Sequence, residues 1–431
     1  MTTPPARAAS TTDLHRVVDA VWRMESARIV GALTRVTGDV GLAEELAQDA
    51  LVAALERWSE TGVPARPGAW LMATARHRAI DRFRRSANLQ RKTAELGREL
   101  AEREGVEEDW AAALDEVVED DVLRLVFIAC HPVLSGEARV ALTLRLVGGL
   151  TTNEIARAFL VPEPTLAQRI VRAKRALTAA RVPFEMPAGA DFTERLGSVL
   201  EVLYLIFNEG YAATAGEDWM RPALCREALR LGRILAGLVP AEPEVHGLVA
   251  LMEIQASRLA SRTDANGGPV LLGDQDRSRW DRVLITRGLA ALRLAEDSGA
   301  ALGPYGLQAS IAACHARAAT VEVTDWARIA ALYEALAQVG PSPVVELNRA
   351  VAVSRAYGPG AGLELVDALT DHPALRGYHL LPTVRGDLLE QLGRRDEARA
   401  DFERAASLTR NEQERRLLLD RAAACAAALG A

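Results

Sequence analysis

Apolar residues recur along this chain at helical spacing rather than in alternation. Leu14, Val18 and Val21 lie four and three positions apart, and the same rhythm returns in most later stretches. Such spacing puts apolar side chains on one face of an α-helix and leaves the polar ones on the other. Ala and Leu dominate and only 5% of residues are aromatic, which also favours helix. The pattern predicts an all-α protein, and 431 residues suggest two to four domains.

The stretch from Thr151 to Leu177 predicts two helices joined by a tight turn. Thr151 and Glu154 have the spacing of a capping box, in which each side chain binds the other residue's amide. Pro164 stands where a first-turn proline is tolerated, because its missing N–H would be unpaired anyway. The second helix has a buried stripe at steps of four, three and four, made by Leu166, Ile170, Ala173 and Leu177.

The other face of this second helix is polar and basic. It consists of Thr165, Gln168, Arg169, Arg172 and Arg175. Hydroxyl, amide and guanidinium groups on one short helix suit phosphates and base edges in the DNA major groove. The alternative is a solvated basic helix in an ordinary helical pair. The helix lengths and the turn favour a helix-turn-helix.

Two upstream stretches carry opposite charge. In residues 37–58, Asp39 can cap a helix whose outer face is acidic and polar, with Glu44, Glu45, Gln48 and Asp49. Between Arg66 and Lys92 there are eight cations and one acid. The candidate DNA-binding residues of that stretch are Trp70, Arg76, Arg78, Arg82, Arg84 and Arg85. An excess of this size is an electrostatic footprint for phosphates, and aromatic rings can stack on unpaired bases. The alternatives are a solvated acidic face, and core burial of Trp70 and Phe83.

Charge reverses again after residue 92. Residues 93–121 hold twelve acids and two arginines, so we interpret 89–120 as an acidic linker between two basic modules. The uneven charge matters more than the net charge of −7, which by itself argues against nucleic acid.

The second half, from about residue 190, predicts a series of helical hairpins. Five stretches have helical patterning: 224–235, 245–259, 283–294, 307–319 and 326–338. Residues 384–408 have the small-residue spacing of a tetratricopeptide repeat, an array that forms concave surfaces for peptides or partner proteins. The run from Asn208 to Tyr211 is interpreted as a helix end with a packed tyrosine, and a polar site is the alternative. Two tryptophan-containing loops, 216–222 and 274–282, leave the same choice open.

Other chemistry is scarce in the sequence. The four cysteines form no CxxC pair, and Cys130-His131 is interpreted as a structural pair rather than a metal site. We find no nucleophile elbow, no phosphate loop and no metal-ligand spacing, so we expect no enzyme, no cofactor and no metal. No apolar stretch fits a signal peptide or a membrane span, so a cytoplasmic location is expected.

Three motifs in order give the chain a family resemblance. AEELAQDAL, AWLMATARHRAIDRFRR and EIARAFLVPEPTLAQRIVRAKRAL resemble the polymerase-docking helix, the −10 segment and the −35 helix-turn-helix of an extracytoplasmic-function sigma factor of the sigma-70 family. The resemblance implies a region 2-like domain at 13–88, a region 4-like domain at 121–181, and a tetratricopeptide-like extension at 190–431. Two departures from the family stand out. Leu160 replaces the usual turn glycine, and Pro164 to Gln168 replace a Gly-Thr-Val-Lys-Ser run.

The resemblance implies partners as well as a fold. The acidic helix is expected to bind the β′ clamp helices of core RNA polymerase, and the second module is expected to meet the β flap and promoter DNA. The extension is expected to regulate activity or to bind a partner protein. The alternatives left open are a stand-alone helix-turn-helix regulator, and an enzyme or small-ligand sensor in residues 190–431.

Overall fold

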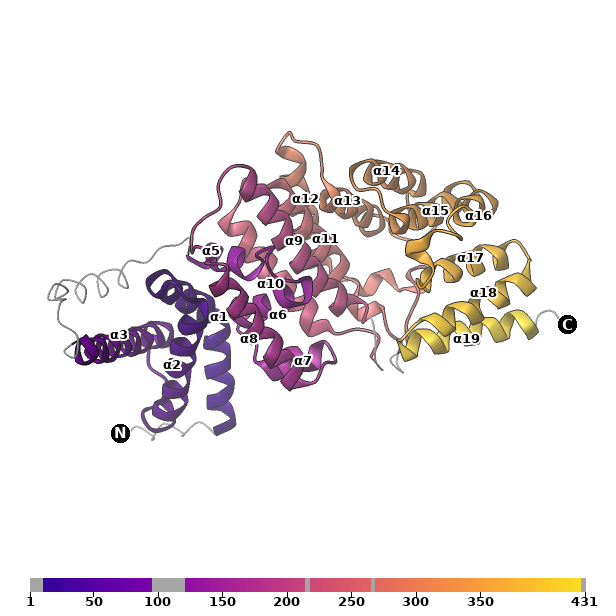
Figure 1. The fold of residues 1–431 in the computed structure, drawn as a ribbon. Coiled ribbons are helices and arrows are strands. Elements are labelled where there is room, and N and C mark those ends of the chain that lie inside the picture. Colours follow the sequence, from indigo (N-terminus) through magenta and orange to yellow (C-terminus); the bar gives the residue numbers. More distant parts are fainter. Residues whose placement is uncertain (1–10, 95–120, 214–217, 265–267, 428–431) are drawn as a thin grey trace, which may run out of the picture. The chain divides into compact units, whose positions relative to one another are not determined.

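The protein is built from α-helices alone. The computed structural model describes residues 11–94, 121–213, 218–264 and 268–427, and within these ranges it contains eighteen α-helices and no β-strand (Figure 1). The predicted all-α class is therefore confirmed. The chain divides into two compact units, residues 1–202 and 203–431, and the boundary falls inside helix α9 (Ala190–Tyr211).

The first unit contains two groups of helices. The first group is α1 (Thr11–Thr37), α2 (Val40–Thr61) and α3 (Pro67–Ala94). The second group is α5 (Asp121–Ala129), α6 (Gly136–Leu146), α7 (Thr152–Ala158) and α8 (Glu163–Ala179). The predicted acidic linker lies almost entirely at residues 95–120, outside the described ranges.

Helix α1 packs against both groups. Its apolar stripe, which includes Val18, Ile29 and Leu33, is almost fully buried against α2, α3 and α5. Arg35 at its end donates through Nε to the carboxylate of Asp121 at 2.9 Å, at the first residue of α5. Apolar burial and a half-buried ion pair thus both join the two groups of helices.

The second unit is a succession of helix pairs. Its helices after α9 are α10 (Pro222–Leu238), α11 (Pro243–Ala256), α12 (Arg282–Asp297), α13 (Pro304–Arg317), α14 (Trp326–Val339), α15 (Pro343–Tyr357), α16 (Pro359–Asp367), α17 (Leu380–Gln391), α18 (Arg395–Leu408) and α19 (Glu412–Ala427). The five helical stretches predicted between 224 and 338 coincide with α10 to α14, because their apolar spacing already identified the buried faces.

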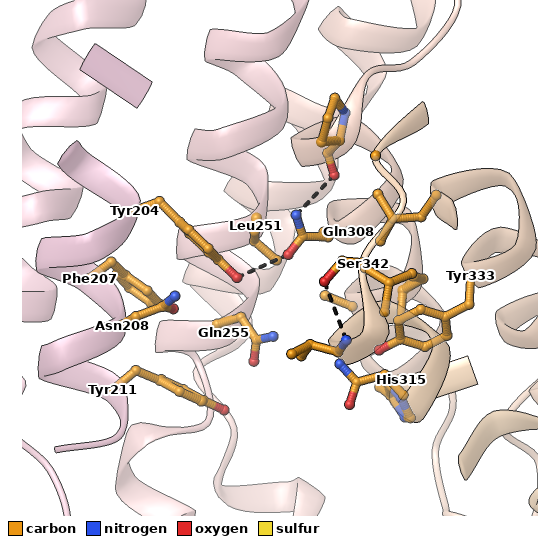
Figure 2. Close-up of a pocket in the computed structure, with 18 of the residues that line it drawn as sticks. Tyr204, Phe207, Asn208, Tyr211, Leu251, Gln255, Gln308, His315, Tyr333 and Ser342 are labelled. Carbon is orange, nitrogen blue, oxygen red and sulfur yellow. Dashed lines mark hydrogen bonds between the residues drawn. The ribbon is translucent and has the colours of Figure 1, made fainter. Parts of the chain in front are cut away.

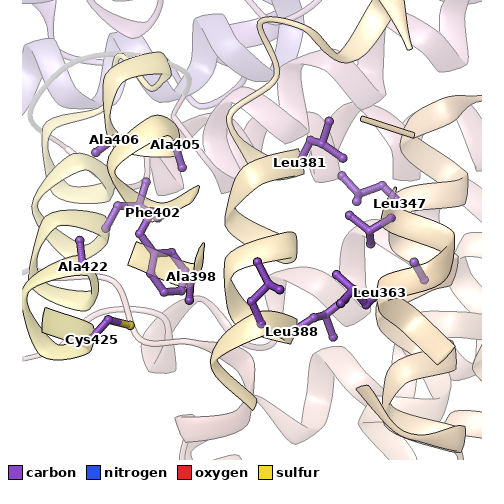
Figure 3. Packing of buried hydrophobic residues seen from close by; sticks show 14 of the residues in the cluster. Leu347, Leu363, Leu381, Leu388, Ala398, Phe402, Ala405, Ala406, Ala422 and Cys425 are labelled. Carbon is purple, nitrogen blue, oxygen red and sulfur yellow. The ribbon is translucent and has the colours of Figure 1, made fainter. Parts of the chain in front are cut away.

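The last helices share one apolar cluster (Figure 3). Phe402 of α18 is fully buried there, with Ala398 and Ala422 close by. Gly386 of α17 faces this ring, and a Cβ at that position would come within 2.9 Å of Phe402 Cε1. Only glycine lets α17 and α18 approach so closely, which explains the small-residue spacing noted at 384–408.

None of the helices in the described ranges combines the length and the hydropathy that a bilayer span requires.

Candidate nucleic-acid interface

Helices α7 and α8 form the predicted helix-turn-helix. The Thr151 hydroxyl accepts from the Glu154 amide at 3.2 Å, and the Glu154 carboxylate accepts from the Thr151 amide at 2.8 Å. This is the predicted capping box, and Pro164 lies in the first turn of α8 as predicted. The predicted stripe, Leu166 to Leu177, is buried at all four positions. These local predictions are confirmed.

The turn between the two helices contains strained backbone. Leu160 has a φ of +50°, in the left-handed region that side chains with a Cβ rarely adopt. Its side chain is 55% exposed, so little burial compensates the strain. The Val161 amide still donates to the Ala156 carbonyl at 3.0 Å and closes the turn. The turn therefore has a backbone conformation that suits glycine, adopted here by a leucine at a cost of about 1–2 kcal/mol.

The polar face of α8 is mostly open to solvent. Thr165, Gln168, Arg172 and Arg175 are exposed. Arg169 is half-buried, and its Nη2 lies 2.7 Å from the Glu137 carboxylate of α6. The helix therefore presents hydroxyl, amide and two guanidinium groups together, and the third arginine is held by an acid of its own module.

Helix α3 carries the second basic surface. Leu71, Ala75 and Ala79 make its buried stripe, and Arg82, Arg84 and Arg85 are exposed. The remaining candidates Trp70, Arg76 and Arg78 are half-buried.

Two aromatic residues of α3 lie between core and surface. Trp70 packs edge-on against Trp58 of α2 with ring centroids 5.4 Å apart, and Trp58 is almost fully buried. Phe83 is also half-buried. Neither residue is fully buried, so both keep some accessible surface.

Helix α2 presents the acidic residues, with one exception. The Asp39 side chain accepts from the Leu42 amide at 2.9 Å and caps the helix as predicted. Glu45 and Asp49 are exposed and Gln48 is half-buried, whereas Glu44 is only 5% exposed. Asp49 lies 3.9 Å from Arg78 of α3.

Glu44 is buried because two cations of the second group of helices surround it. Its Oε1 accepts from Arg145 Nε at 2.6 Å, and its Oε2 accepts from Lys174 Nζ at 2.8 Å. Arg145 belongs to α6 and Lys174 to α8, so one carboxylate joins three helices. The predicted outer acidic face is therefore corrected at Glu44. Neither cation was singled out from the sequence, since their partner lies 101 and 130 positions away.

The Cys130-His131 pair lies inside the first unit. The Cys130 sulfur is 3.3 Å from the Thr143 hydroxyl, and burial raises the pKa of this thiol to about 12. Burial, followed by the positive charge of Arg195, lowers the pKa of His131. In the described ranges no three His, Cys, Asp or Glu side chains gather in a way that could hold a metal ion.

Comparisons with known proteins agree with this geometry. The family described as Sigma-70 region 2 matches residues 21–88, and Sigma-70 region 4 matches residues 124–177. Residues 195–296 match a family of unknown function, DUF6596. No solved structure gave a significant match.

The relatives differ in how much of this chain they match. An uncharacterized protein of Rhizobium meliloti, R00370, is 47% identical over 92% of this chain and 93% of its own length. The ECF RNA polymerase sigma factor SigL of Mycobacterium tuberculosis is 31% identical over 33% of this chain and 76% of its own length. The ECF RNA polymerase sigma factor SigK of Mycobacterium ulcerans is 28% identical over 41% of this chain and 96% of its own length.

The region 2 and region 4 matches fall on the two groups of helices in the first unit, in the order that the sequence motifs predict. Two of the relatives that match this part, SigL and SigK, are named as ECF RNA polymerase sigma factors. The chain belongs to the extracytoplasmic-function sigma factors of the sigma-70 family, and it carries a long helical C-terminal extension.

Proposed function

We propose that this sigma factor grips promoter DNA through α8 and α3 while α2 docks on core RNA polymerase. The observation that carries the proposal is the open polar face of α8, where Thr165, Gln168, Arg172 and Arg175 are exposed together above a fully buried stripe. A short helix of this kind places its side chains on base edges and phosphates of the major groove. We assign this face to the −35 element, with Arg169 joining it when released from Glu137.

The −10 element is assigned to the exposed side of α3. Arg82, Arg84 and Arg85 are exposed and can contact phosphates, whereas Arg76 and Arg78 are half-buried. The half-buried Trp70 keeps some accessible surface and can stack on an unpaired base, which contributes roughly 1–3 kcal/mol. Flipping a base out of the duplex costs a few kcal/mol, so one stack together with phosphate contacts offsets it.

Polymerase docking is assigned to Glu45, Gln48 and Asp49 of α2. These side chains are the accessible part of the acidic face, and they suit the basic β′ clamp helices that the family binds. Glu44 can join them only after it leaves Arg145 and Lys174. The region 4-like module is assigned to the β flap as well as to DNA, and the protein acts in the cytoplasm without covalent chemistry of its own.

The −35 assignment is tested by salt-dependent binding of the sigma–polymerase complex to a promoter fragment. Replacing both Arg172 and Arg175 by Ala removes two candidate phosphate contacts. The negative slope of log K against log salt concentration should therefore become shallower by about two. The control replaces Arg226 and Arg293, which are also exposed but belong to the second unit. An unchanged slope in the α8 variant would show that this face does not meet DNA.

The docking assignment is tested by co-purification with core polymerase. Reversing Glu45 and Asp49 to Lys should abolish binding, because two attractive charges become repulsive. Reversing Glu56 and Glu60, exposed on the same helix, makes an equal change of charge and should leave binding intact. Equal behaviour of the two pairs would reject the surface. Tight, specific promoter binding by the chain alone would favour a stand-alone regulator.

The extension is proposed to regulate the sigma part or to bind a partner protein. SigK is matched over 96% of its length by 41% of this chain, so a sigma factor can be complete without such an extension. The Rhizobium relative, in contrast, matches 92% of this chain. Deleting residues 190–431 and measuring promoter-dependent transcription tests a regulatory role, and unchanged activity and promoter choice would exclude it.

A further inference from the structure

The second unit contains a cavity of about 480 Å³, within the size range of small-molecule sites (Figure 2). Tyr204, Asn208 and Tyr211 of α9 lie on one side, and His315 of α13 and Tyr333 of α14 lie on the other. Asn208 and Tyr211 are the two ends of the run for which a polar site was the alternative interpretation, and both form part of the wall.

One permanent charge lines the cavity. Arg258, two residues beyond the end of α11, is only 9% exposed. Its Nη2 donates to the Tyr211 hydroxyl and to the Gln255 side-chain oxygen, and its Nε has no hydrogen-bond partner in the described ranges. None of the residues described as lining the cavity is Asp or Glu, so the guanidinium has neutral partners only.

A second buried arginine lies close behind the wall. Arg277 is 6% exposed, and it donates to the carbonyls of His315 and Ala318 at 3.0 and 2.9 Å and to the Thr324 hydroxyl at 3.1 Å. Its guanidinium and that of Arg258 lie 5.2 and 5.6 Å from the ring of Trp280. Aromatic rings and neutral oxygens contact both guanidinium groups, and the nearby acid Glu322 partly offsets the charge of Arg277.

His315 lies near both arginines, and their charges affect its pKa. Burial, followed by the charges of Arg258 and Arg277, lowers the pKa of His315 to about 3. The ring is therefore neutral near pH 7, and its Nδ1 lacks a partner in the described part of the chain. A neutral imidazole beside Arg258 leaves the charge of that guanidinium without an acidic partner at the cavity wall.

We propose that this cavity binds a small organic carboxylate, with Arg258 as its counter-ion. A buried charge is disfavoured unless it is paired, and guanidinium pairs best with planar carboxylate or phosphate. With one charged group on the wall and otherwise neutral amides and hydroxyls, a monoanion fits better than a phosphate dianion. Phe207, Leu251, Ile311 and Leu336 supply apolar surface for the body of the ligand. The recognition chemistry is that of an aromatic or similarly apolar acid.

The test measures binding to the full-length chain by thermal shift and calorimetry. The probes are benzoate, 4-hydroxybenzoate and indole-3-acetate, with benzamide as the uncharged match and phenyl phosphate as the dianion. We expect at least one carboxylate to raise the melting temperature in a saturable way and benzamide to have no effect. Arg258→Gln should lower the affinity for that carboxylate by about tenfold or more, whereas Arg293→Gln on the exposed face of α12 should leave the affinity unchanged.

A second variant separates binding from folding. Ala312→Leu narrows the cavity from the side of α13 and leaves the Arg258 guanidinium in place, so it should also lower the affinity for the carboxylate. Without ligand, Arg258→Gln should melt no lower than wild type, since it removes a charge that lacks an acidic partner.

Several outcomes overturn the proposal. They are no response to any carboxylate, equal responses to benzoate and benzamide, and unchanged affinity in Arg258→Gln. A variant that melts several degrees lower with unchanged affinity assigns Arg258 a purely structural role. A stronger response to phenyl phosphate overturns the choice of carboxylate. These readouts are independent of transcription, so they stand apart from the sigma activity.

Discussion

Replacing Glu44 by Gln tests the link between the two groups of helices in the first unit. The Glu44 side chain is 7% exposed, and those of Arg145 and Lys174 are 16% and 20% exposed. Removing one partner of a buried ion pair leaves the other charge unpaired and costs about 3–5 kcal/mol. Gln keeps the volume and one acceptor oxygen, so we expect the lower end, about 3 kcal/mol.

Hydrogen exchange of the full-length chain measures this change locally. A loss of about 3 kcal/mol corresponds to exchange faster by about a hundredfold, at 1.4 kcal/mol per tenfold. The effect should appear in peptides from α2 and α6. The control is Glu45→Gln, one residue away and exposed, where the change should stay within about 0.5 kcal/mol. Equal exchange in the two variants would refute a stabilising role for the three-helix ion pair.

Three further changes test other parts of the structure. Leu160→Gly should raise the free energy of unfolding by about 0.5–1 kcal/mol in denaturant titrations, because relief of left-handed strain exceeds the entropy that glycine adds to the unfolded chain. Leu160→Ala keeps the strained backbone, so an equal gain in stability in that variant would contradict this explanation. The pKa of His315 is lowered to about 3, so as pH falls below about 6.5 the unfolded chain takes up a proton that the folded chain does not. Wild type should therefore lose about 1.6 kcal/mol more stability than His315→Gln between pH 6.5 and 5, and parallel curves would contradict the assignment. All four cysteines are buried, and burial raises the pKa of Cys130 and Cys225 to about 12, so Ellman's reagent should label none at pH 8 until urea unfolds the chain.

Local features of the first unit could be predicted from the sequence. The capping box at Thr151, the Asp39 cap and the buried stripe of α8 follow from spacing within one or two turns. The three ordered motifs led to the family, because each places its chemistry on a single helix. The left-handed conformation of Leu160 was suggested only by the glycine that the family usually has there.

Features that join distant segments could not be predicted. A helical wheel places Glu44 beside Glu45 on the polar side of α2, and nothing local reveals that α6 and α8 supply two cations to it. The cavity of the second unit could not be predicted for the same reason, because its wall combines residues from distant segments between 204 and 348. Arg258 was not singled out from the sequence, since the lack of an acidic partner is visible only once the surrounding helices are placed.

Transcription in vitro from a pool of genomic fragments, with purified core polymerase and sequencing of the RNA 5′ ends, tests most directly whether this chain directs initiation. A sigma factor should give discrete start sites that share two upstream elements and require this chain. Replacing Arg172 and Arg175 by Ala should reduce initiation at those sites. Start sites no different from those of core polymerase alone would show that the chain does not select promoters.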